Sequence, residues 1–222
     1  MRMPSAKQLR SLEKAVTKYA GSLSLATSYL QGRGIGEETA RAWRLGVVAS
    51  PEPGHETAVG RLCIPYVNRV GVIALKFRCM QDHNCKAEGC VKYTQPMGQE
   101  VYLFNVLAAD GDGETIHITE GELDCVVLSE VLAEPVVGVP GVNNWKPHAH
   151  WHFKGWPRVL IWGDGDQAGT DFARHLRKEI ANAEIVPMPS RHDVTSLYLE
   201  AGAEAIKQLV GTDEDGGDND QV

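Results

Sequence analysis

Short apolar runs alternate with helical stretches along the second half of the chain. Residues 115–119, 135–139 and 158–162 are largely apolar and bounded by turn residues, so we expect three strands. Helical stretches are expected at 120–133 and 170–181. Strands that alternate with helices in this way are typical of an α/β unit with a parallel sheet.

The first half of the chain predicts a different structure. Residues 1–20 are expected to form a weakly amphipathic helix, and residues 24–45 two helical stretches broken at 32–34. Residues 61–78 carry apolar and β-branched runs around a turn at 68–69, which is typical of a β-hairpin. We therefore expect a smaller mixed α+β lobe ahead of the α/β lobe.

Turn-rich and acidic segments mark the expected boundaries. Asp110-Gly111-Asp112-Gly113 is expected to form a hinge, and residues after Thr212 have too few apolar side chains to fold. The expected parts are an N-terminal helical arm at 1–25, a basic lobe at 26–113, an α/β lobe at 114–211 and a disordered acidic tail at 212–222.

The formal net charge of −7 is unevenly distributed along the chain. Residues 1–113 carry a net charge of +4, residues 114–211 one of −6, and the last eleven residues one of −5. A basic lobe beside an acidic one suits a protein that binds phosphates and metal in neighbouring places. No apolar run approaches the ~20 residues of a membrane span and no signal peptide is recognisable, so we expect a cytoplasmic protein, in the bacterial host if it is phage-encoded.

Acidic side chains follow two of the expected strands. Asp164 and Asp166 come just after the third strand, and alternate residues of an extended chain point to the same side. Glu120 follows the first strand directly, and Asp124 lies one helical turn beyond it. Because the carboxyl ends of parallel strands meet at one edge, these acids are expected to converge there. Such hard oxygen ligands suit Mg²⁺ or Mn²⁺.

Two motifs together resemble the Toprim domain of DnaG-type primases, topoisomerases, some nucleases and recombination proteins. They are Glu120-Gly-Glu-Leu-Asp124 and Gly163-Asp-Gly-Asp-Gln-Ala-Gly169. The surrounding chain resembles the DnaG-type primase core in particular, at residues 29–46, 61–66, 71–78, 92–93 and 193–202. The resemblance covers roughly residues 26 to 210 and implies a Rossmann-like Toprim lobe with a mostly parallel sheet, in a compact form like those of phages or plasmids.

The resemblance implies a DNA primase catalytic core that makes short RNA primers on single-stranded DNA from ribonucleoside triphosphates during replication. It implies Glu120, Asp164 and Asp166 as catalytic metal ligands, with Asp124 and Asp193 holding a further ion or ordering the first ligands. Expected contacts to nucleotide or template are Arg61, Arg78, Lys92 and Tyr93, with Lys146 as a further candidate. A replicative helicase, or a separately encoded zinc-ribbon or helicase subunit, is the implied partner.

Some of these assignments have alternatives. Asp193 suits a helix N-cap as well as it suits a metal ligand, and Glu122 is expected to face solvent. A Toprim-type metal-dependent nuclease would share the acids without needing the basic residues. A non-catalytic subunit of a split primase-helicase would bind DNA or a partner while another chain polymerises.

Residues 79–90 depart from the primase pattern because they hold three of the five cysteines. Cys79, His83, Cys85 and Cys90 could bind Zn²⁺, since thiolate and imidazole are its usual ligands. The segment lacks the usual Cys-x-x-Cys pair, so a loop insertion with free thiols is the favoured interpretation. A disulfide is not expected in a reducing cytoplasm.

Overall fold

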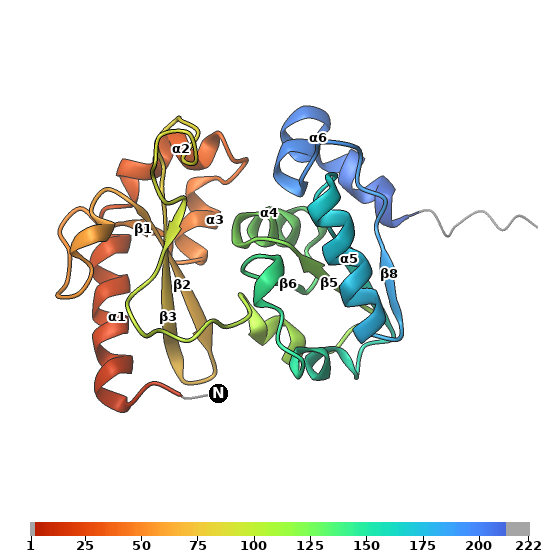
Figure 1. Cartoon of the computed structure of the whole chain (residues 1–222), viewed down its shortest axis with the longest axis horizontal. Helices are drawn as coiled ribbons and strands as arrows, with labels where there is room; N and C mark the ends of the chain where they lie inside the picture. Colours follow the sequence, from red (N-terminus) through yellow and green to blue (C-terminus); the bar gives the residue numbers. More distant parts are fainter. Residues whose placement is uncertain (1–2, 212–222) are drawn as a thin grey trace, which may run out of the picture.

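The computed structural model describes residues 3–211, so the predicted acidic tail at 212–222 lies outside the described residues. The chain folds into two lobes that stand side by side, each built around its own four-stranded sheet (Figure 1). We call them the antiparallel lobe, residues 6–94, and the parallel lobe, residues 106–210. The predicted fold class, with a mixed lobe ahead of a parallel α/β lobe, is confirmed. The predicted boundaries between parts stay a prediction.

The antiparallel lobe packs helices against a sheet with the strand order β1-β2-β3-β4. The predicted hairpin is the β2–β3 pair, and the helices predicted at 1–20 and 24–45 are α1, α2 and α3. The elements are α1 (Ala6–Ala20), η1 (Leu23–Ala26), α2 (Thr27–Gln31), α3 (Glu37–Ala42), β1 (Gly46–Val47), η2 (Glu56–Ala58), β2 (Leu62–Asn68), β3 (Gly71–Arg78) and β4 (Tyr93–Thr94).

The parallel lobe has a sheet with the order β6-β5-β7-β8, in which all neighbours are parallel. The three predicted strands are β5, β6 and β7, while β8 was not predicted. The elements are η3 (Val106–Asp110), β5 (Thr115–Thr119), α4 (Glu122–Leu132), β6 (Val136–Gly138), η4 (Val142–Asn144), η5 (Ala149–Phe153), β7 (Arg158–Trp162), α5 (Gln167–Glu179), β8 (Ala183–Ile185) and α6 (Val194–Val210).

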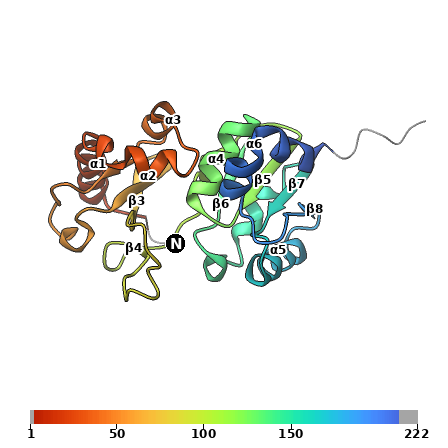
Figure 2. The ribbon, with the colours of Figure 1, turned by 90° about the horizontal axis from the view of Figure 1, so that it is seen from above.

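The helices of the parallel lobe divide between the two faces of its sheet. Helices α4 and α6 lie together on the side toward the antiparallel lobe, and α5 lies apart from them (Figure 2). The buried residues Phe172, Ala173 and Leu176 of α5 belong to a separate apolar cluster that includes Val159 and Ile161 of β7. None of the helices in the described part of the chain is long and apolar enough to cross a membrane.

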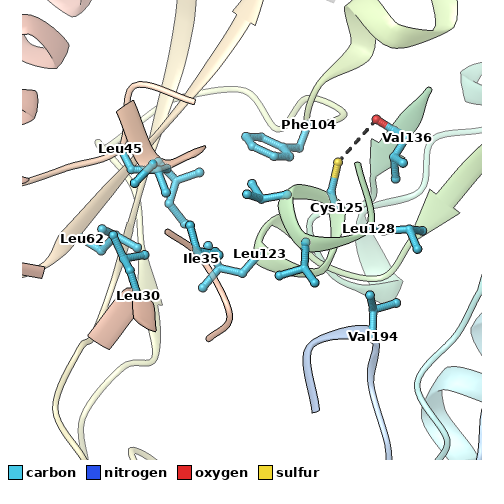
Figure 3. Close-up of a cluster of buried hydrophobic side chains, with 14 of the residues drawn as sticks. Leu30, Ile35, Leu45, Leu62, Phe104, Leu123, Cys125, Leu128, Val136 and Val194 are labelled. Carbon is cyan, nitrogen blue, oxygen red and sulfur yellow. Dashed lines mark hydrogen bonds between the residues drawn. The ribbon is translucent and has the colours of Figure 1, made fainter. Parts of the chain in front are cut away.

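A continuous apolar core joins the two lobes. Leu30, Ile35 and Leu45 of the antiparallel lobe share one buried cluster with Phe104 and Leu123 beside the parallel sheet (Figure 3). Burial of apolar surface is the main favourable contribution to folding, so this core holds the lobes in one relative position. The two lobes therefore present their polar groups to each other in a fixed arrangement.

Glu122 also joins the lobes, and the prediction that it faces solvent is wrong. Its side chain is only 1% exposed, and its Oε1 accepts hydrogen bonds from Tyr66 Oη and Lys76 Nζ, each at 2.5 Å. The first turn of α4 packs against β2 and β3 rather than against water. The sequence could not show this, because the lobe that covers this turn comes from a distant part of the chain.

Candidate functional site

Acidic side chains gather at the carboxyl ends of β5 and β7. These strands are parallel neighbours, with Thr119 opposite Trp162, so Glu120 and Asp164 both lie just beyond the same sheet edge. The backbone N–H of Asp164 donates to the Glu120 carboxylate. Asp124 follows in the first turn of α4. We call this group, with Asp166, the metal edge.

The turn between β7 and α5 holds Asp164 and Asp166 in different surroundings. A Cβ atom on Gly165 would lie 2.0 Å from the carbonyl oxygen of Pro189, and one on Gly169 would lie 2.2 Å from that of Asp164, so both positions require glycine. Asp166 caps α5, since its Oδ1 accepts from the backbone N–H of Gly169 at 2.8 Å. Asp166 is exposed, whereas Asp164 is partly buried.

The acids of the metal edge repel one another. Burial raises the pKa of Asp164 to about 8, and the charges of Glu120 and Asp124 add to the rise. Burial likewise raises the pKa of Glu120, whose Oε2 is buried without a hydrogen-bond partner. Partly buried carboxylates that repel one another and leave an oxygen unpaired fit a site for a divalent cation, which would stabilise their charged forms.

Asp124 and Asp193 both have protein donors. Asp193 caps α6, accepting from the Ser196 backbone N–H at 2.6 Å, which agrees with the N-cap interpretation. Asp124 accepts from the backbone N–H of Thr195 at 3.0 Å and from its hydroxyl at 2.7 Å. Burial raises the pKa of Asp124, and the charge of Asp193 adds to the rise. Their roles as metal ligands stay a prediction.

A hollow of about 690 Å³ lies in the antiparallel lobe, and we call it the basic hollow. Desolvation lowers the pKa of Lys92 in its lining, and the charges of Arg78 and Arg33 lower it further. The negative charges of Asp124 and Asp164 have the opposite effect and raise the pKa of Lys92. The basic hollow therefore lies within electrostatic reach of the metal edge. Its lining consists of Tyr29, Arg33, Arg78, Cys79, Gln81, His83, Asn84, Cys85, Lys86, Cys90 and Lys92.

The structure brings only some of the predicted basic residues together. Arg78 lines the basic hollow, but it is just 6% exposed, and its guanidinium donates to the hydroxyl of Tyr93. Arg61 does not line the hollow and donates to the carbonyl oxygen of Val91 at 2.7 Å. Lys146 lines a separate hollow of about 150 Å³. The phosphate contacts predicted for these residues stay predictions.

Two further cations of the basic hollow, Arg33 and Lys86, were missed by the sequence analysis. Arg33 lies between two glycines after α2, and Lys86 lies among the cysteines of the loop. Neither position belongs to a periodic pattern, so only the folded arrangement shows that they face the same space. The sequence offered one indication of their role: both are cationic residues in a segment with a net positive charge.

The side chains of Cys79, His83, Cys85 and Cys90 come together in the wall of the basic hollow. Their ligand atoms all lie within 4.8 Å of one another, a spacing at which they could bind a metal ion. Among residues 3–211, no other group of His, Cys, Asp and Glu side chains has this spacing.

Comparisons with known proteins support the fold, although no family model matches the chain. The Gene 57 protein of Mycobacterium phage D29 is 36% identical over 156 residues, which cover 68% of this chain and 98% of that protein. The RNA polymerase domain of Mycobacterium tuberculosis primase DnaG has a TM-score of 0.74 at 18% identity, over 93% of this chain and 83% of that domain. A DnaG primase catalytic domain bound to single-stranded DNA has a TM-score of 0.72 at 18% identity, over 94% and 80%. This chain thus belongs to the family of the phage D29 Gene 57 protein and has the fold of the DnaG primase catalytic core.

Proposed function

We propose that this chain is a DNA primase catalytic core, a nucleotidyltransferase that extends short RNA on a single-stranded DNA template in the cytoplasm. The observation that carries the proposal is the position of the basic hollow, whose Lys92 is within electrostatic reach of Asp124 and Asp164. Chain extension needs negative charge to hold metal and positive charge to hold phosphates, close to each other. The solved relative bound to single-stranded DNA supports a DNA template.

The reaction is attack of the primer 3′-hydroxyl on the α-phosphate of a ribonucleoside triphosphate, with pyrophosphate leaving. Glu120, Asp164 and Asp166 would hold Mg²⁺ or Mn²⁺, which when bound neutralises phosphate charge and favours the ionised hydroxyl. Glu120 has a raised pKa and an unpaired oxygen, which suit it to accept the proton of the attacking hydroxyl. The role of Glu120 as proton acceptor, like the resemblance of this lobe to the Toprim domain, is part of the proposed function.

The basic hollow would hold the phosphates. Lys92 and Arg33 would contact the triphosphate or the template backbone, because both face the hollow and Lys92 is near the acids. Arg78 would act through its charge and by bracing Tyr93, since its guanidinium lies 5.0 Å from the Tyr93 ring centre and is largely covered. The buried Arg78 would therefore position Tyr93, and the more accessible Lys92 and Arg33 would bind phosphate.

The test is primer synthesis by the purified chain on single-stranded DNA with labelled ribonucleotides and Mg²⁺ or Mn²⁺. We expect short RNA from the wild type and none from the Asp164→Asn/Asp166→Asn double variant. Asp171→Asn is the matched control, because Asp171 is exposed on α5, one turn after Asp166. RNA synthesis that survives in the double variant would refute the proposed metal ligands.

Two other outcomes would change the assignment. Metal-dependent loss of the DNA template without RNA would indicate the nuclease alternative. DNA binding without either reaction would indicate a subunit that needs a partner chain, such as a helicase or a zinc-ribbon subunit, and the assay should then be repeated with that partner.

A further inference from the structure

We propose that Cys79, His83, Cys85 and Cys90 bind one Zn²⁺ ion and that this ion shapes the wall of the basic hollow. We call these four residues the cysteine cluster. The proposed site lies in the segment that departs from the primase pattern. It does not depend on the proposed polymerase activity, because neither its ligands nor its geometry involve the metal edge.

The spacing of the ligand atoms fits a single tetrahedral ion. The distance from His83 Nε2 to Cys79 Sγ is 3.7 Å and to Cys85 Sγ 3.3 Å, while Cys85 Sγ and Cys90 Sγ are 3.3 Å apart. Tetrahedral Zn²⁺, with Zn–S of about 2.3 Å and Zn–N of about 2.0 Å, places neighbouring ligand atoms roughly 3.5–3.8 Å apart. These three distances lie within a few tenths of an ångström of those values, and all four ligand atoms lie within 4.8 Å of one another.

The donor set selects the type of metal. Three thiolates and one imidazole are soft ligands that favour zinc, whereas Mg²⁺ and Ca²⁺ require oxygen donors. Four protein ligands fill a tetrahedral site and leave no position for water or substrate, as in structural zinc sites. The expected role is thus to hold the chain in shape rather than to take part in a reaction.

The loop has little else to hold it. From Cys79 to Lys92 no residue is fully buried, and only Met80 packs, partly buried, against an apolar core. Its backbone is turned by hydrogen bonds from Cys90 to Cys85 at 2.8 Å and from Cys79 to Lys92 at 2.9 Å. A segment that buries so little apolar surface needs another source of stability, and the free energy of metal binding can supply it.

The consequence for the basic hollow follows from its lining. All four residues of the cysteine cluster line the hollow, as do Arg78 and Lys92, which flank the loop at either end. An ion bound to the cluster would fix the loop and with it the position of Lys86. The zinc would then be a structural support for the surface that receives phosphates, and only this last step rests on the proposed function.

Metal content of the full chain, purified without chelator or reductant, tests the site. We expect one zinc ion per chain in the wild type and loss of zinc in Cys85→Ser/Cys90→Ser. His83→Ala should bind zinc more weakly, and His175→Ala, an exposed histidine on α5, should bind it as the wild type does. Wild-type zinc content in the double variant would overturn the proposal, and so would a wild type that contains no zinc.

Two measurements on the wild type remain informative if the variants fail to fold. Co²⁺ added to metal-free protein should give the visible spectrum of a tetrahedral ion with thiolate charge transfer, and absence of this spectrum would overturn the site. A lysine-specific protease should cleave after Lys86 once zinc is chelated and not while it is bound, and equal cleavage in both states would overturn the structural role. Neither readout requires RNA synthesis.

Discussion

The metal edge and the cysteine cluster both bring ligand atoms together, but the chain builds them in opposite ways. Glu120 and Asp164 stand at the ends of neighbouring strands, so the parallel sheet sets their separation. The cysteine cluster sits in a loop from Cys79 to Lys92 in which no residue is fully buried. The first site is positioned by the fold, whereas the second lies in a loop that is shaped by local hydrogen bonds and by the packing of Met80.

The difference indicates how each site would use a cation. At the metal edge the fold holds carboxylates together, and burial, with repulsion between the acids as a smaller cause, raises the pKa of Glu120 and of Asp164. Because the fold sets the positions of these carboxylates, we expect a cation there to leave and return without a change of structure. In the cysteine cluster we expect the cation and the loop conformation to depend on each other. We therefore expect an exchangeable hard ion at one site and a retained soft ion at the other.

Removing one charge from the metal edge is the strongest way to test this comparison. In Glu120→Gln we expect RNA synthesis to fall by about a thousandfold, because a metal ligand and proton acceptor is lost. Thermal stability should stay equal or rise, since the neutral amide relieves repulsion by Asp124 and Asp166. Primer synthesis and thermal unfolding, measured on the same sample, check both expectations.

Glu130→Gln is the matched control for this variant, because Glu130 is exposed on the same helix, α4. It should change neither activity nor stability. If Glu120→Gln instead unfolds at a clearly lower temperature, then the metal edge is a structural element, and the contrast with the cysteine cluster disappears.

Removing the carboxylate of Glu122, which is paired with Lys76, should lower the stability, whereas neutralising the unpaired Glu120 should not. Glu122→Ala removes the partner of Lys76, whose side chain is only 14% exposed, and leaves a largely buried ammonium without a carboxylate. We expect the free energy of unfolding to fall by about 3 kcal/mol, the usual loss when a buried ion pair is broken on one side. Urea denaturation measures it, with Glu130→Ala as the control, expected within about 0.5 kcal/mol of the wild type.

The same comparison separates two kinds of acid near the start of α4. The Glu122 carboxylate is paired with the Lys76 ammonium, so it is not available to bind a metal ion. Asp124 and Glu120 instead repel neighbouring carboxylates. A loss below 1 kcal/mol in Glu122→Ala would mean that Lys76 finds another partner. Glu122 would then have to be reconsidered as part of the metal edge.

The pH dependence of stability should report on Asp164. Burial raises its folded-state pKa to about 8, well above the usual value of 3.8. Between these values the folded chain keeps a proton that the unfolded chain loses, so this contribution to stability is full at acid pH and is lost as the pH rises toward 8. From pH 6 to 8 without Mg²⁺, we expect the wild type to lose more thermal stability than Asp164→Asn.

Added Mg²⁺ should cancel that difference at pH 8, because the cation replaces the proton as the group that neutralises the carboxylate. Thermal unfolding curves of both proteins, with and without Mg²⁺, provide the measurement. Parallel pH profiles for the two proteins would show that Asp164 is ionised throughout and would remove the evidence for repulsion at the metal edge.

The two sites also differ in how far the sequence could predict them. Strand, acid and helix follow one another twice, and the geometry of parallel sheets then brings Glu120 and Asp164 to one edge. The strands, helices and hairpin follow from local sequence patterns, and the parallel sheet brings the carboxyl ends of its strands to one edge. The parallel lobe, the hairpin and the grouping of the acids could therefore all be predicted. Whether the acids bind metal stays a prediction, because it depends on affinity rather than on position.

What could not be predicted depends on contacts between distant segments. The burial of Glu122 follows from the lobe that covers α4, and the position of Arg33 follows from packing after α2. The spacing of Cys79, His83, Cys85 and Cys90 matches no familiar motif, so free thiols were the favoured interpretation. The turns that close this loop place the four ligand atoms within 4.8 Å, which the spacing in sequence did not reveal.

The smallest expected effect compares two lysines of the basic hollow, Lys86 on the loop and Lys92 beside the metal edge. Each phosphate contact adds about 0.7 to the slope of the logarithm of single-stranded DNA affinity against that of salt concentration. Lys92→Ala should lower the slope by this amount with or without zinc, because β4 follows Lys92 directly. Lys86→Ala should lower it only while zinc holds the loop, and Lys146→Ala, in a separate hollow, should leave it unchanged. If chelation leaves the effect of Lys86→Ala intact, the loop keeps its shape unaided, and the two sites are held by the fold alike.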